Sequence, residues 1–78
     1  MQITLRFFDD LKQAFGRDEV RVECQEGATV SQLVAAFLNQ RGLIRFKGVE
    51  FGFLVNEGFA GSHTMLKNGD TLSLMPPL

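Results

Sequence analysis

Tryptophan and tyrosine are absent from this 78-residue sequence, and Cys24 is its single cysteine. A chain with one cysteine forms no internal disulfide, and it does not supply the several thiolates that an iron–sulfur cluster requires. Cysteine usage of this kind is typical of a reducing compartment. We therefore expect a cytoplasmic protein without an iron–sulfur centre.

An excess of one charge and a long apolar run are also missing. Eight basic and nine acidic residues give a net charge of −1, and they are interspersed, which argues against binding to nucleic acid or an anionic membrane. The longest apolar run, LVAAFL, is far shorter than the roughly 20 residues that span a bilayer. The N-terminal segment alternates polar and apolar residues, unlike a signal peptide. We expect one domain, residues 1–78, that binds neither nucleic acid nor a membrane.

Two segments near the N-terminus alternate polar and apolar side chains, which is typical of half-buried strands. They are residues 3–8 (ITLRFF) and residues 20–24 (VRVEC). The segment between them, DDLKQAFGRDE, fits a loop or a short turn of helix. The two strands are predicted to form a hairpin.

The period changes after Gly27. The apolar residues recur at helical spacing on one stripe, formed by Val30, Leu33, Val34, Phe37 and Leu38. Thr29 and Gln32 have the spacing of a capping box, which predicts the start of the helix. Gly42 stands where a left-handed residue would end it, with Arg41 in the last turn.

The C-terminal half contains shorter segments. Residues 43–50 fit either a loop on the core or an extra strand, and residues 51–56 fit a strand with Phe51, Phe53 and Val55 facing inward. The remaining expectations are a turn at 56–58, a brief strand at Phe59-Ala60, a helical turn at 64–66, a tight turn at Asn68-Gly69 and a last strand at 71–75.

One helix and four to five strands make an α+β domain. A helix that follows an N-terminal hairpin and covers one face of the sheet buries all the apolar stripes. The crossover through this helix lets the last strand lie parallel to the first. We therefore predict a β-grasp, or ubiquitin-like, fold with a mixed sheet and a short tail at residues 76–78.

Several stretches resemble the small ubiquitin-like sulfur carriers along the whole chain. They are the opening ITLRFFDDLKQAFG, the helix entry at Thr29-Val30, the strand end at Val55-Asn56 and the closing LKNGDTLSLMPP. The sequence is most similar to the MoaD type, the small subunit of molybdopterin synthase. The thiamin sulfur carrier ThiS is a more distant relative.

The resemblance implies a carrier without catalytic residues or a cofactor of its own. In that family a C-terminal Gly-Gly carboxylate is adenylated by an activating enzyme, becomes a thiocarboxylate, and enters the large subunit of the synthase. These two proteins are therefore the expected partners. Pro76, Pro77 and Leu78 correspond to the base of that tail, and the sequence ends at Leu78 without Gly-Gly. Two hypotheses follow: a sulfur carrier for molybdopterin synthesis whose working tail ends in Gly-Gly, or a diverged ubiquitin-like binding module without sulfur transfer.

Four apolar residues are predicted to face away from the helix and to bind partners. They are Phe8, Leu54, Phe59 and Met75, and Arg6 and Arg45 are expected at their rim. The alternative is that Phe8 and Phe59 wrap round the edge and complete the core.

His63 has no second ligand at metal-binding spacing and is expected in a solvated loop, and Cys24 is expected to be a small core residue.

Overall fold

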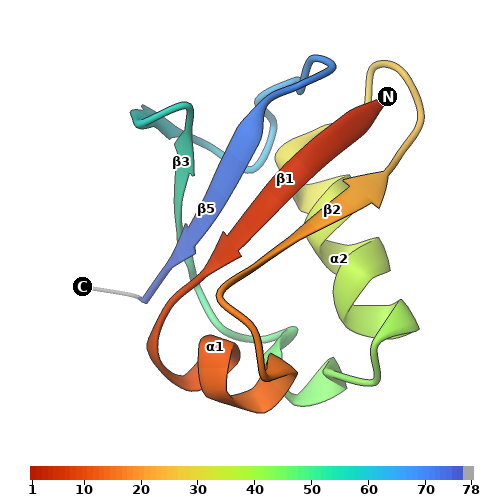
Figure 1. The fold of residues 1–78 in the computed structure, drawn as a ribbon. Coiled ribbons are helices and arrows are strands. Elements are labelled where there is room, and N and C mark those ends of the chain that lie inside the picture. The colour runs from red at the N-terminus through yellow and green to blue at the C-terminus, as the bar shows by residue number, and fades with distance from the viewer. Residues whose placement is uncertain (77–78) are drawn as a thin grey trace.

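The computed structural model describes residues 1–76 (Figure 1). A mixed sheet contains β1 (Gln2–Phe7), β2 (Glu19–Glu23), β3 (Gly52–Val55), β4 (Gly58–Ala60) and β5 (Thr71–Met75). Its spatial order is β2-β1-β5-β3-β4, with β1 and β5 parallel and the other pairs antiparallel. This arrangement confirms the predicted β-grasp fold, the N-terminal hairpin and the parallel pairing of the first and last strands.

The helix α2 (Val30–Gln40) covers one face of this sheet, and the opposite face is open (Figure 1). The capping box is present, because the Thr29 side chain accepts a hydrogen bond from the Gln32 amide while the Gln32 side chain accepts one from the Thr29 amide. At the other end, Gly42 has φ +68° and the Leu43 amide bonds the Leu38 carbonyl. The helix therefore begins and ends where its capping residues predict.

The core lies between α2 and the central strands. All five residues of the predicted helix stripe are buried, and so are Leu5, Leu72 and Leu74 on the sheet. The parallel register sets Leu5 beside Leu72. Alternation along each strand places every second residue toward the helix, which explains why these side chains meet.

Three aromatic rings close one end of the core. The ring centroids of Phe7, Phe15 and Phe37 lie 5.1–5.4 Å apart. Phe15 comes from α1 (Asp9–Phe15), a helix of seven residues that ends at Gly16 with φ +87°. The segment between the first two strands is therefore helical rather than a loop, and burial of Leu11 and the contacts of Phe15 hold it against the core.

One expectation for the second half needs correction, and one of two alternatives left open there is excluded. Residues 64–66 do not form a helical turn: the Thr64 amide bonds the Gly61 carbonyl in a turn, and Met65 forms an isolated bridge with Thr29. The ambiguous segment after α2 contains the 3-10 helix η1 (Ile44–Phe46) rather than an extra strand. In both places a long-range contact, to Thr29 or to the core, overrides the local pattern.

Two general properties complete the description of residues 1–76. None of their helices is long and apolar enough to cross a membrane. Their acidic, histidine and cysteine side chains form no cluster of three or more that could hold a metal ion. His63 is exposed in a turn, as expected, and Cys24 is half-buried against the core.

Candidate functional site

The sheet face opposite α2 carries the predicted partner-binding residues. A row of directly paired positions crosses it from β1 to β4: Arg6 lies beside Ser73, Ser73 opposite Leu54, and Leu54 opposite Phe59. Paired residues have their side chains on the same face of a sheet. These four positions therefore share one surface that no helix covers (Figure 1).

Phe59 is the most exposed large apolar residue of this surface, with a relative accessibility of 97%. It lies on β4, which is an edge strand of three residues. Leu54, its partner across the hairpin, is half-buried, and neither residue belongs to the core cluster. The alternative in which Phe59 completes the core is therefore wrong.

Phe8 follows β1 and precedes the first residue of α1. Its backbone is extended, with φ −137° and ψ 157°, so the strand alternation continues and Phe8 lies on the same side as Arg6. The Arg6 guanidinium carbon is 5.7 Å from the centroid of the Phe8 ring. This cation–π contact gathers an arginine and an aromatic ring at the rim of the face. Phe8, like Phe59, is not part of the core cluster.

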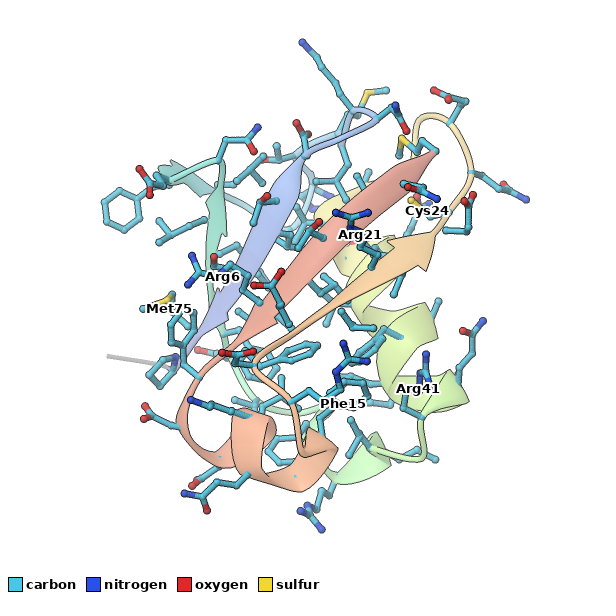
Figure 2. The ribbon with its side chains drawn as sticks, viewed as in Figure 1. Arg6, Phe15, Arg21, Cys24, Arg41 and Met75 are labelled. Carbon is cyan, nitrogen blue, oxygen red and sulfur yellow. The ribbon has the colours of Figure 1, made fainter. Side chains whose placement is uncertain are left out.

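Met75 is the last residue of β5, and it lies opposite Gly52. A Cβ atom at Gly52 would lie 3.6 Å from the Met75 Cβ, so the glycine leaves the methionine without a neighbouring side chain on that strand. Figure 2 shows Arg6 and Met75 projecting from this open face. Pro76 follows and is exposed, whereas the predicted tail residues Pro77 and Leu78 lie outside the described residues.

Arg45, the second expected rim residue, is not on the sheet. It belongs to η1, and its guanidinium carbon lies 5.0 Å from the centroid of its neighbour Phe46. The structure thus brings Phe8 close to Arg6 and pairs Leu54 with Phe59, while it places Arg45 elsewhere. The alternation of residues 43–50 is too irregular to have indicated this.

The start of the tail-bearing strand is held by a hydrogen-bond network that the sequence pattern did not reveal. The Asn56 side chain donates to the Asp70 carboxylate (2.8 Å) and accepts from the Thr71 amide (2.9 Å). The second Asp70 oxygen accepts from the Lys67 amide (2.8 Å). Asn68, in the expected tight turn, accepts from the Gln2 amide. The network ties the β3–β4 turn, β1 and β5 together.

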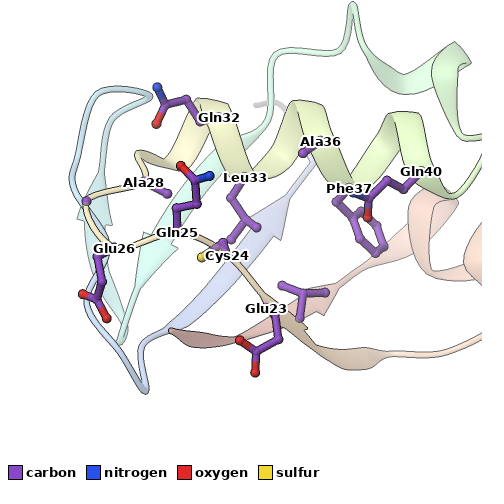
Figure 3. Close-up of a pocket in the computed structure, with 12 residues that line it drawn as sticks. Glu23, Cys24, Gln25, Glu26, Ala28, Gln32, Leu33, Ala36, Phe37 and Gln40 are labelled. Carbon is purple, nitrogen blue, oxygen red and sulfur yellow. The ribbon is translucent and has the colours of Figure 1, made fainter.

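Cys24, the only cysteine, lies next to a groove between β2 and α2 (Figure 3). Burial raises the pKa of its thiol, the N-terminal ammonium group opposes this shift, and the carboxylates of Glu23 and Glu26 add to it. A raised pKa leaves little thiolate at neutral pH. This shift disfavours the thiolate form, which is the nucleophile.

A five-stranded mixed sheet with a central parallel pair and one covering helix defines a ubiquitin-like β-grasp protein. The sequence profile of the ThiS family matches residues 5–78, and the chain belongs to this family. Its fold is that of the ThiS- and MoaD-like sulfur carriers, which are small and generally non-catalytic proteins. No curated protein sequence matches the chain at a significant level.

Solved structures with this fold cover almost the whole chain. A protein assigned as molybdopterin converting factor subunit 1 from Pyrococcus furiosus is 24% identical, with a TM-score of 0.85 and coverage of 100% of this chain and 99% of the other. Small archaeal modifier protein 1 from Haloferax volcanii is 24% identical, with a TM-score of 0.86 and coverage of 99% and 98%. A complex of subunits 1 and 2 of the Helicobacter pylori molybdopterin-converting factor matches at 25% identity, with a TM-score of 0.68 and coverage of 100% and 96%.

Proposed function

We propose that this protein is a MoaD-like sulfur carrier of molybdopterin synthesis, which acts through a C-terminal thiocarboxylate. It is a non-catalytic subunit that binds the large subunit of a molybdopterin synthase-like complex and an adenylating activating enzyme. Membership of the ThiS family and the subunit 1–subunit 2 complex from Helicobacter pylori support this assignment. We further propose that it acts in the cytoplasm.

The observation that carries the proposal is the position of β5. This strand is the middle strand of the sheet, with β1 on one side and β3 on the other, and its residues Leu72 and Leu74 are buried. A tail that must reach into a partner requires a rigid base, because the position of its tip depends on where its first residue is held. Pro76, whose ring restricts the backbone, directly continues this anchored strand.

The open sheet face supplies the docking surface in this proposal. Phe59 and Leu54, paired across the hairpin, form one apolar part of it. Phe8, which contacts Arg6, and Met75, the last residue of β5, are further half-buried apolar residues of this face. Exposed apolar residues with an arginine at their rim are common at protein interfaces. Both partners must reach the same tail, so we propose that they bind this face in turn rather than together.

The chemistry proposed for the tail requires no catalytic side chain from this protein. The terminal carboxylate attacks the α-phosphate of ATP and forms an acyl-adenylate with release of pyrophosphate. A sulfur atom from a persulfide donor on another protein then displaces AMP, and reduction of the resulting acyl disulfide frees the thiocarboxylate. The large subunit provides the site where that sulfur is transferred to a pterin precursor.

The test uses the full-length native protein, purified from its own host. It is incubated with the host's activating enzyme, MgATP, a persulfide donor and a thiol reductant, and its C-terminal peptide is measured by mass spectrometry. The expected result is the mass gain of sulfur replacing one oxygen. A protein that binds the activating enzyme but never gains this mass in the presence of ATP contradicts the carrier function.

The second hypothesis is a ubiquitin-like binding module without sulfur transfer. The exposure of Phe59 is compatible with it as well, because a docking residue on β4 requires no tail chemistry. The variant Leu54→Asp distinguishes the two when binding and thiocarboxylate formation are measured together. The carrier hypothesis expects both to fall, whereas the binding-module hypothesis expects binding to fall and thiocarboxylate to be absent even in the parent protein.

A further inference from the structure

A groove of about 610 Å³ lies between α2, the end of β2 and the loop that follows β2, at the edge of the sheet away from β4 (Figure 3). Val22 and Glu23 of β2 line it, together with residues 24–28 of the loop. Its apolar lining comes from Val22 on β2 and from Leu33, Ala36 and Phe37 on α2. The exposed amide side chains of Gln32 and Gln40 flank Ala36 along the helix. The small side chain of Ala36 between these two amides leaves the groove open at its centre.

The outer edge of β2, whose Val22 and Glu23 line the groove, carries unpaired backbone groups. β2 is an edge strand, and within residues 1–76 it pairs only with β1. The bonds that Cys24 exchanges with Met1, and the bond from Phe7 to Asp18, show that the even-numbered residues of this strand bond β1. Since donors and acceptors alternate in an antiparallel ladder, the N–H and C=O groups of Glu19, Arg21 and Glu23 point away from the sheet.

An open row of backbone donors and acceptors beside a groove with both apolar and polar lining matches one kind of ligand. An extended peptide can pair with the edge strand, and its alternate side chains then enter the groove. The side chains facing the groove would be small and aliphatic, because they lie over Val22, Leu33 and Ala36. The other side chains would lie beside Glu19, Arg21 and Glu23, on the open face of the sheet.

The charges along β2 indicate what those other side chains are. The residues on the open face, Glu19, Arg21 and Glu23, are an acid, a base and an acid, and all three are exposed. Opposite charges across paired strands stabilise the pairing, and like charges oppose it. We propose that the β2 edge binds an extended segment of another protein that alternates small aliphatic residues with a base–acid–base pattern.

A second copy of this chain fits the site less well. Two antiparallel edge strands are related by an axis perpendicular to the joined sheet, so both α2 helices would lie on the same side of it and next to the joint. A single extended segment brings no helix with it. This proposal does not rest on sulfur-carrier function, because none of Phe8, Leu54, Phe59 and Met75 contributes to the groove.

The probe is a blocked synthetic peptide with the core Lys-Val-Glu-Val-Lys, which reads the same in both strand directions. Amide hydrogen exchange is followed by NMR on the full-length protein with and without the peptide. In the free protein the amides of Arg21 and Glu23 should exchange quickly, whereas those of Val20 and Val22 should be protected by β1. Bound peptide should slow exchange at Arg21 and Glu23 and leave the two valines unchanged.

Two altered peptides test the two parts of the recognition without changing the protein. Methylation of the peptide nitrogens that face β2 should weaken binding at least about tenfold, because several backbone hydrogen bonds are lost together. The charge-reversed peptide Glu-Val-Lys-Val-Glu should bind roughly tenfold more weakly, because three cross-strand pairs become repulsive. Equal affinity of all three peptides would overturn the proposal.

Two protein variants complete the test. Ala36→Glu fills the groove from an exposed helix position, so it should fold normally and lose at least about tenfold in affinity for the Lys-Val-Glu-Val-Lys peptide. Ser31→Glu, at another exposed position of α2 that does not line the groove, is the matched control and should bind normally. Absence of peptide binding at millimolar concentration overturns the proposal. Slow exchange of the Arg21 and Glu23 amides that appears without peptide when the protein concentration is raised also overturns it, because a second copy would then be the occupant.

Discussion

The side-chain amide of Asn56 donates a 2.8 Å hydrogen bond to the carboxylate of Asp70, fourteen residues later in the sequence. Asn56 is the first residue of the β3–β4 turn and has φ +50°, a conformation that asparagine tolerates better than most residues. Asp70 directly precedes β5. The bond therefore holds the start of the tail-bearing strand against the turn that presents Phe59.

A double-mutant cycle should detect this contact as a coupling between the two positions. Asn56→Gly removes the amide but keeps a residue that tolerates positive φ, and Asp70→Ala removes the carboxylate. We expect the two changes to be less than additive by about 0.5–1.5 kcal/mol, the usual net value of one hydrogen bond. Urea unfolding of the four proteins measures it. Strict additivity would show that the bond contributes nothing to stability.

Gly69 should be required at the turn before β5. It has φ +88°, and its amide bonds the Gln2 carbonyl at 2.8 Å. Gly69→Ala should destabilise the fold by about 1–2 kcal/mol, because a Cβ atom is disfavoured in the left-handed region. Gly48→Ala is the matched control: its φ is not positive and a Cβ would contact nothing within 4 Å. Thermal unfolding should separate the two variants, and equal melting temperatures would contradict the prediction.

Phe59 should contribute to partner binding but not to the fold. Phe59→Ser removes the ring of a residue that is 97% exposed, so the stability of the free protein should change by no more than about 0.5 kcal/mol. If the proposed face binds the large subunit, the affinity should fall by about 2 kcal/mol or more, as for an aromatic residue at the centre of an interface. Isothermal titration calorimetry with that subunit measures the change.

Ile44→Ser is the control for this experiment, because Ile44 is also an exposed apolar residue but lies on η1 instead of the sheet. It should bind like the parent protein. Equal losses for the two variants would show that general surface hydrophobicity, not the face around Phe59, determines binding.

Cys24 should react slowly with alkylating agents in the folded state. Its thiol pKa is raised by burial, so less thiolate is present at neutral pH than in an unfolded chain. The rate of iodoacetamide labelling should rise with pH in both states, and for the folded protein the rise should occur at higher pH than for the protein unfolded in urea. Because the folded state binds the thiol proton more tightly than the unfolded state, the protonated thiol contributes to the stability of the fold at neutral pH. This contribution is lost as the pH rises through the folded-state pKa. A folded-state curve at lower pH than the unfolded one would contradict this.

Much of the fold could be predicted from local patterns. The alternation in residues 3–8 and 71–75, the helical stripe that begins at Val30, and the capping residues Thr29 and Gly42 each depend on neighbours within a few positions. The parallel pairing of the first and last strands could also be predicted, because the crossover through α2 allows the last strand to lie beside the first in the same direction. The apolar residues expected to face away from α2 could be identified in the same way, since alternation assigns each one to a side of the sheet.

Other features depend on contacts between segments that are distant in the sequence. Met65 forms a bridge with Thr29 where a helical turn was expected, and Arg45 belongs to η1 and so does not lie on the sheet. The Asn56–Asp70 bond, the exposure of Phe59 and the groove between β2 and α2 likewise exist only after the strands are ordered. The sequence by itself determined the main strands and α2 and which face each presents, because these depend on local spacing. Tertiary structure alone decided which of those faces are covered, because burial requires a partner that local spacing does not identify.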